Sequence, residues 1–134
     1  MDQLRVAEAY ESVMLVVDDD LAVRNSLRFI LEVEGFQVRV YSSAEELLNE
    51  ASLPDPSCLV VDYHMPGMNG LELVAQLRVR DVLIPAILIT PAPSENLRTR
   101  AAAAGVSIVE KPLLGSRLLD SVRMAFDGHS KSPS

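Results

Sequence analysis

Short apolar segments alternate with longer amphipathic ones along the whole chain. Four segments are continuous and mostly aliphatic: VMLVV (13–17), CLVV (58–61), AILIT (86–90) and VSIV (106–109). A fifth, QVRVY (37–41), alternates polar and apolar side chains. Runs of this length that are rich in Val, Ile and Leu predict β-strands, and continuous runs are typical of strands buried on both faces of a parallel sheet.

A stretch with helical periodicity follows each of these segments. Residues suited to cap or end the first four helices stand at the expected places: Ser43, Asn69 and Ser94 as N-caps, Gly35 and Gly105 as C-terminal glycines. Ser43 and Glu46, three positions apart, form a capping-box signature. The fifth helix is predicted within GSRLLDSVRMAF (115–126). Five repeats of strand then helix predict an α/β fold, a doubly wound parallel sheet joined by right-handed crossovers.

The composition is that of one domain with an aliphatic core, because 49% of the 134 residues are hydrophobic and none is Trp. A net charge of −7 argues against a nucleic-acid-binding surface. The single cysteine, Cys58, excludes an internal disulfide framework and lies in an apolar run, so we expect it to be buried. The sequence shows neither a membrane span nor a signal peptide, and we expect a cytoplasmic domain over 13–126, with an extension (1–12) and a tail or linker start (127–134).

Polar side chains gather where the predicted strands end. In chain order they are Asp18, Asp19, Asp20, Asp62, Thr90, Glu110 and Lys111. Since sites in doubly wound sheets form outside the carboxyl ends of the strands, we expect these groups to converge. Packed carboxylates repel one another unless a cation intervenes, and oxygen ligands suit Mg²⁺. Lys111 and Thr90 could then hold a phosphoryl group, and Asp62 could act as the nucleophile toward phosphorus.

Four motifs in this order resemble the receiver domain of two-component response regulators. They are VVDDD (16–20), VVDYHMPGMNGLEL (60–73), ILIT (87–90) and VEKP (109–112), and the resemblance extends over residues 13–126. The MPGMNGLEL stretch is most similar to receivers of the FixJ type. The resemblance implies a flavodoxin-like fold of five strands, in the order 2-1-3-4-5, flanked by five helices.

The same resemblance implies a role for each candidate site residue. Asp62 would be the phosphoacceptor, and Asp18 and Asp19 would hold Mg²⁺ together with Asp62. The backbone carbonyl of His64 would be a further metal ligand. Thr90 and Lys111 would contact the phosphoryl group, and the Lys111–Pro112 peptide would be cis.

The resemblance also implies partners. A sensor histidine kinase would supply the phosphoryl group, and the surface made by residues 94–105, 106–109 and 115–126 would then signal to an output domain or partner protein. A homodimer and an indirect role in transcription regulation are compatible with this. The chain would be a signalling domain that phosphorylates and dephosphorylates itself, not a turnover enzyme, and neither a membrane nor nucleic acid is expected to bind it directly. The ending SKSPS favours an excised part of a longer regulator over a free-standing receiver.

Two substitutions depart from the family pattern. Pro91 stands where the family usually has Ala or Gly, and proline lacks the N–H that would hold the phosphoryl group. Ile108 replaces the aromatic residue that switches with phosphorylation. These departures leave open an alternative, a binding module that works without phosphorylation. A Mg²⁺-dependent phosphatase is disfavoured, because it needs an acid two residues after the nucleophile, where His64 stands.

Overall fold

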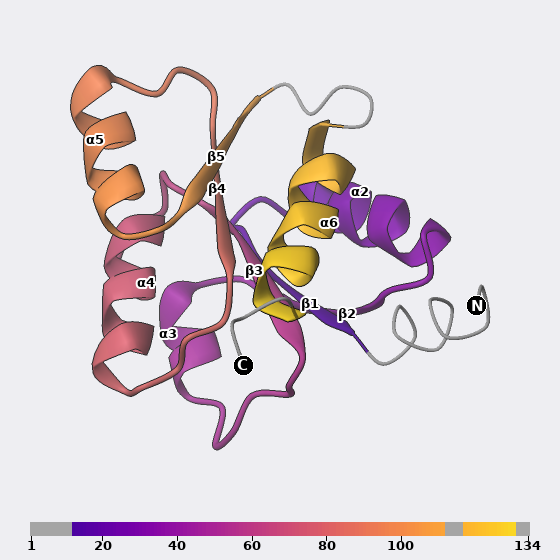
Figure 1. The fold of residues 1–134 in the computed structure, drawn as a ribbon. Helices are drawn as coiled ribbons and strands as arrows, with labels where there is room; N and C mark the ends of the chain where they lie inside the picture. The colour runs from indigo at the N-terminus through magenta and orange to yellow at the C-terminus, as the bar shows by residue number, and fades with distance from the viewer. Residues whose placement is uncertain (1–11, 112–116, 131–134) are drawn as a thin grey trace.

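The computed structural model describes residues 12–111 and 117–130, and its strands form one parallel sheet in the order β2-β1-β3-β4-β5 (Figure 1). The strands are β1 (Val13–Val17), β2 (Gln37–Tyr41), β3 (Ser57–Asp62), β4 (Ala86–Thr90) and β5 (Ser107–Glu110). The helices are α2 (Leu21–Val33), α3 (Ala44–Leu48), α4 (Gly70–Val79), α5 (Glu95–Ala103) and α6 (Arg117–Ser130). The predicted fold class and strand order are therefore confirmed.

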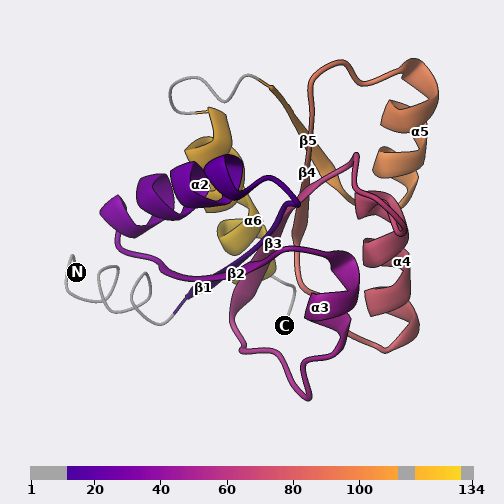
Figure 2. The ribbon, with the colours of Figure 1, turned by 180° about the vertical axis from the view of Figure 1, so that it is seen from behind.

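The sheet is buried on both faces between two helical layers. Helices α2 and α6 cover one face, and α3, α4 and α5 cover the other (Figures 1 and 2). Successive side chains of β1 enter opposite layers, Met14 and Val16 beneath α2 and α6, Leu15 and Val17 beneath the other three helices. Cys58 is 0% exposed, as predicted. Burial on both faces is the reason why β1, β3 and β4 have continuous apolar sequences, whereas the edge strand β2 alternates.

Three helices end in the same hydrogen-bonded turn, in which one residue adopts a left-handed conformation. That residue is Gly35 (φ 97°) after α2, Gly105 (φ 71°) after α5 and Asp81 (φ 65°) after α4. In each case the next N–H bonds back into the last helical turn, as the Val106 N–H does to the Ala101 carbonyl at 2.8 Å. Val106 belongs to this turn, so β5 begins at Ser107 and not at the predicted residue 106.

We expect two substitutions at these helix ends to change the free energy of unfolding in opposite directions. Asp81→Gly should raise the free energy of unfolding by about 0.5 kcal/mol, because glycine adopts a positive φ without strain. Gly105→Ala should lower it by about 1 kcal/mol, although a Cβ there would meet nothing within 4 Å. Urea unfolding of the two variants measures both changes. Equal changes of the same sign would contradict this account of the turns.

Other helix ends differ in part from the predicted ones. Ser43 caps α3 through the Glu46 N–H, but the Glu46 carboxylate accepts from the N–H of Ser42, so only half of the predicted capping box forms. The helix α6 continues to Ser130, so residues 127–130, predicted as tail, are helical. The domain boundaries themselves stay a prediction. Within the described residues, none of the helices has the length and apolar character needed to cross a bilayer.

Candidate functional site

The carboxyl ends of four neighbouring strands bring the predicted site residues to one edge of the sheet. Asp62 and Thr90 are the last residues of β3 and β4, and Asp18 and Lys111 directly follow β1 and β5. Asp62 pairs in register with Ile89. The Lys111 N–H donates to the Thr90 carbonyl at 2.9 Å, which holds the two loops side by side. Asp18, Asp62, Thr90 and Lys111 thus converge as predicted from the sequence, whereas Glu110 of the same predicted set forms an exposed ion pair with Arg98.

Three carboxylates and one ammonium form the centre of the site. Asp18, Asp19 and Asp62 each present an oxygen within 4.8 Å of the others. Asp18 and Asp62 are 1% and 6% exposed, whereas Asp19 faces solvent. The Lys111 Nζ lies 3.3 Å from Asp62 Oδ2 and 3.9 Å from Asp18 Oδ2. Lys111 therefore offsets only part of the negative charge of the three acids.

The surroundings of Asp18 change the pKa of its carboxyl. Burial is the largest cause, and it raises the pKa of the Asp18 carboxyl from 3.8 to about 6. The Asp20 N–H and Lys111 oppose this rise, while the negative charges of Asp62 and Asp19 add to it. The Asp18 Oδ2 is buried without a hydrogen-bond partner. Among the described residues, the cation that faces this oxygen is Lys111, whose Nζ lies 3.9 Å away.

The donor set fits Mg²⁺. Its ligand atoms are all carboxylate oxygens, which are the ligands that a small, hard cation prefers. The unpartnered Asp18 Oδ2 and the mutual repulsion of the acids would both be relieved by a divalent ion. The Thr90 Oγ1 is likewise buried without a partner, and it supplies a hydroxyl donor at the same edge.

The structure assigns the third acid of the Asp18–Asp20 run to a different task. The Asp20 carboxylate accepts from the N–H groups of Ala22 and Val23 and so caps α2. Sequence reasoning missed Arg24, whose Nη1 donates to the Asp18 carbonyl at 2.7 Å. The sequence contained one signal for this contact. Arg24 lies one helical turn after the N-cap Asp20, beside the face of α2 that buries Leu27.

His64 is the second residue after Asp62, and its N–H donates to Asp62 Oδ1 at 3.3 Å. The imidazole of His64 packs edge-on against the Tyr63 ring, with 4.8 Å between the ring centroids. The proposed metal-ligand role of the His64 carbonyl stays a prediction. Pro112 lies outside the described residues, and so does the predicted cis peptide before it.

Gly70, the first residue of α4, lets this helix approach the acceptor strand closely. Its N–H donates to the Tyr63 carbonyl at 3.1 Å. A Cβ at position 70 would lie 2.7 Å from both the Asp62 carbonyl oxygen and Leu88 Cδ1, closer than van der Waals contact allows. Because position 70 has no side chain, the backbone of Asp62 can lie directly against the start of α4.

We expect Gly70→Ala to lower the free energy of unfolding by about 2–3 kcal/mol, the usual cost of overpacking. The cause is steric, because the clash involves backbone atoms of Asp62, which cannot rotate away. Urea unfolding measures the loss. Gly105→Ala is the matched control, since its loss is one of backbone conformation alone. Equal losses in the two variants would contradict the steric explanation.

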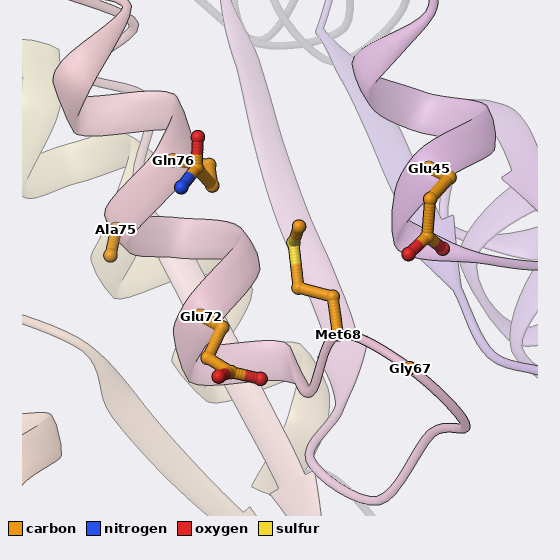
Figure 3. Close-up of a pocket in the computed structure, with 6 residues that line it drawn as sticks. All are labelled: Glu45, Gly67, Met68, Glu72, Ala75 and Gln76. Atoms are coloured by element: carbon orange, nitrogen blue, oxygen red, sulfur yellow. The ribbon is translucent and has the colours of Figure 1, made fainter.

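A hollow of about 440 Å³ lies between α3 and α4, beside the site (Figure 3). Its lining residues are Glu45, Gly67, Met68, Glu72, Ala75 and Gln76. The Glu72 carboxylate already accepts from the Asn69 N–H at 2.8 Å, as part of the capping box that starts α4. The hollow contains none of the converging site residues, so the reactive position remains the edge of the sheet at Asp62.

Known proteins are similar to this chain in both sequence and fold. Relatives include the transcriptional regulatory protein FixJ of Azorhizobium caulinodans, 37% identical over 83% of this chain and 53% of its own length. The C4-dicarboxylate transport transcriptional regulatory protein DctD of Pseudomonas aeruginosa is 36% identical over 85% of this chain and 25% of its own length. The chain thus spans about half, or less, of the length of these curated relatives.

Solved structures agree with the sequence relatives. The structure of FixJ-N is 33% identical with a TM-score of 0.79, covering 87% of this chain and 94% of that one. The response regulator StyR is 34% identical with a TM-score of 0.83, covering 90% and 62%. The response regulator TrrA of Thermotoga maritima, in complex with Mg(2+)-BeF, is 27% identical with a TM-score of 0.72, covering 85% and 98%.

The family profile described as the response regulator receiver domain matches residues 14–123, which include every candidate site residue. With the strand order and the acidic edge of the sheet, this match settles the class of the domain. The chain belongs to the response regulator receiver domain family of two-component signalling.

Proposed function

We propose that this chain accepts a phosphoryl group on Asp62 from a phosphohistidine of a sensor histidine kinase, in a Mg²⁺-dependent reaction. The observation that carries the proposal is the position of Asp62. Its carboxylate lies 3.3 Å from the Lys111 Nζ and shares an edge of the sheet with two further acids. An isolated capping aspartate needs neither the lysine nor the other acids.

The chain's own residues have separate tasks in this transfer. A carboxylate oxygen of Asp62 forms the new bond to phosphorus as the bond from phosphorus to the imidazole nitrogen breaks, and that nitrogen keeps the electron pair. Lys111 faces the Asp62 carboxylate and would offset charge on a phosphoryl oxygen. Thr90, with its free hydroxyl, would donate to another. Asp18, Asp19 and Asp62 would hold Mg²⁺, which neutralises charge in a loose, in-line transition state when bound.

The relatives support this proposal at the level of the family. FixJ and DctD are named transcriptional regulatory proteins, which fits a receiver that controls an output domain. TrrA carries Mg(2+)-BeF, which fits a metal-dependent site that accepts a phosphoryl-like group. We extend both properties to this chain because it has a similar fold and because its own acids and lysine lie together at one edge of the sheet.

We propose that the output surface is formed by α5, β5 and α6. An ion pair of 2.7 Å joins Arg98 of α5 to Glu110, the last residue of β5, which directly precedes Lys111. Ile108, half-buried against the core beneath α5, lies on the same strand. A change at Lys111 would therefore reach a surface that a partner or a second copy of the chain could bind.

A second candidate function is a protein-binding module that works without phosphorylation. Pro91 and Ile108 favour it, because Pro91 has no N–H for a phosphoryl oxygen and Ile108 cannot reproduce the movement of an aromatic switch. Thr90 and Lys111 would then keep the site folded while the output surface stays in one state.

Incubation with a small phosphodonor separates these two functions. Intact mass of the chain should show one added phosphoryl group with Mg²⁺, and none with EDTA. The absence of an adduct at any Mg²⁺ concentration would overturn the leading proposal and favour the binding module. Where an adduct forms, movement of residues 90–94 with an acyl-phosphate mimic tests whether Pro91 blocks switching.

A further inference from the structure

Arg24 lies behind the loop that carries the candidate metal ligands. From the first turn of α2, its Nη1 donates to the backbone carbonyl of Asp18 at 2.7 Å. Its own backbone N–H donates to the Asp20 carbonyl at 3.0 Å, as part of the start of the helix. Arg24 is half-buried, unlike the exposed Arg28 one turn later. One side chain thus ties α2 to the peptide that carries the buried acid.

Asp18 is held at three of its four polar positions. Its N–H donates to the Tyr41 carbonyl at 3.2 Å, and its Oδ1 accepts from the Asp20 N–H at 2.9 Å. Its carbonyl accepts from Arg24, while its Oδ2 has no hydrogen-bond partner. The direction of the free oxygen is therefore set by the other three contacts, of which the bond from Arg24 is the shortest.

Arg24 and Lys111 act on the acids in different ways. The Lys111 Nζ approaches a carboxylate oxygen of both Asp18 and Asp62, Oδ2 in each case. Arg24 donates to a backbone carbonyl, so it adds positive charge near the loop and leaves the carboxylate oxygens to the ion. A residue that orients a ligand from outside the ligand shell typically changes metal affinity when it is replaced.

We propose that Arg24 is a positioning residue for the Mg²⁺ site, which holds the Asp18 carbonyl so that the Asp18 carboxylate stays close to those of Asp19 and Asp62. This inference rests on the proposed function, because it assumes that the acids bind Mg²⁺. It assigns to Arg24 neither a ligand atom nor a contact with the phosphoryl group.

The sign of the change in metal affinity distinguishes this role from a purely electrostatic one. Removing a positive charge close to the acids should by itself tighten the binding of a divalent cation. Removing the hydrogen bond to the Asp18 carbonyl should weaken it, because Asp18 Oδ2 would lose its fixed direction. The two effects oppose each other, and we expect the loss of positioning to be the larger.

The test is the dissociation constant for Mg²⁺ alone, measured by titration calorimetry on the unphosphorylated chain. Arg24→Met keeps the apolar stem without donor or charge, and we expect its dissociation constant to rise about tenfold. Arg24→Lys keeps a charged donor and should remain within about threefold of the unmodified chain. Arg28→Met is the matched control, since Arg28 is one turn further along α2 and pairs with Glu32 on the surface at 3.6 Å.

Urea unfolding in EDTA confirms that each variant is folded before titration. If Arg24→Met does not fold, Arg24→Gln replaces it with the same expectation, because its shorter side chain does not reach the carbonyl. Tighter or unchanged Mg²⁺ binding in Arg24→Met, or in Arg24→Gln where that replaces it, would overturn the proposal. An equal loss of Mg²⁺ affinity in Arg28→Met would overturn it as well. A failure of the unmodified chain to bind Mg²⁺ would overturn the proposed function itself.

Discussion

Asp62→Asn is expected to abolish phosphorylation of the chain, with no added mass at any time of incubation with a phosphodonor and Mg²⁺. The amide removes the nucleophilic oxygen, and it also removes the negative charge that faces Lys111 at 3.3 Å. The substitution preserves shape at a position that is 6% exposed, so the fold should be retained. Intact mass spectrometry measures the loss.

Asp81→Asn is the matched control for this experiment. It makes the same chemical change at an acid just after the end of α4, at a position where asparagine tolerates the left-handed conformation. We expect the control to be phosphorylated like the unmodified chain. A phosphoryl group that persists in Asp62→Asn and maps to Asp18 or Asp19 would show that the acceptor has been misassigned.

The second large effect is a stability gain in Asp18→Asn that depends on pH. The pKa of Asp18 is raised to about 6 in the folded chain, so the folded state binds a proton more tightly than the unfolded state, whose pKa is the ordinary 3.8. Stability contributed by this proton is present below about pH 4 and is lost as the pH rises through about 6. At about 1.4 kcal/mol for each pH unit between the two values, the loss is about 3 kcal/mol.

Urea unfolding of the unmodified chain and of Asp18→Asn in EDTA tests this. At pH 8 we expect the variant to be more stable by up to about 3 kcal/mol, and near pH 4 the difference should be close to zero. Excess Mg²⁺ at pH 8 should stabilise the unmodified chain and reduce the difference. The same difference at both pH values would show that Asp18 is not the acid that limits metal-free stability.

The strands could be predicted closely because burial on two faces leaves a simple record in the sequence. Residues 13–17, 37–41 and 86–90 match the observed strands, and the remaining two predicted segments differ by one residue at each end. The helix after β2 was harder to predict. This helix, α3, is only five residues long and ends at Leu48. Glu50 lies beyond its end and accepts a hydrogen bond from the Tyr41 hydroxyl at 2.8 Å. Such a contact depends on tertiary structure that periodicity does not contain.

The candidate site, too, could be predicted only in part from the sequence. Asp18, Asp19, Asp62, Thr90 and Lys111 could be placed at one edge because each ends or follows a strand, and parallel strands end together. The separate tasks of Asp18 and Asp20 could not be distinguished from three adjacent acids. The role of Arg24 depends on where a long side chain turns, and the raised pKa of Asp18 depends on how completely the loop is covered.

Cys58 gives the chain an internal reporter of its own opening. The thiol is 0% exposed in the middle strand of the sheet, and burial raises its pKa to about 12. Cys58 packs in the core layer that α2 and α6 cover, so a thiol-modifying reagent can reach it only when that layer opens. Since the chain has no Trp, the labelling rate of this single thiol offers a way to follow how often this core layer opens, and whether a phosphorylated Asp62 at the end of the same strand keeps it closed.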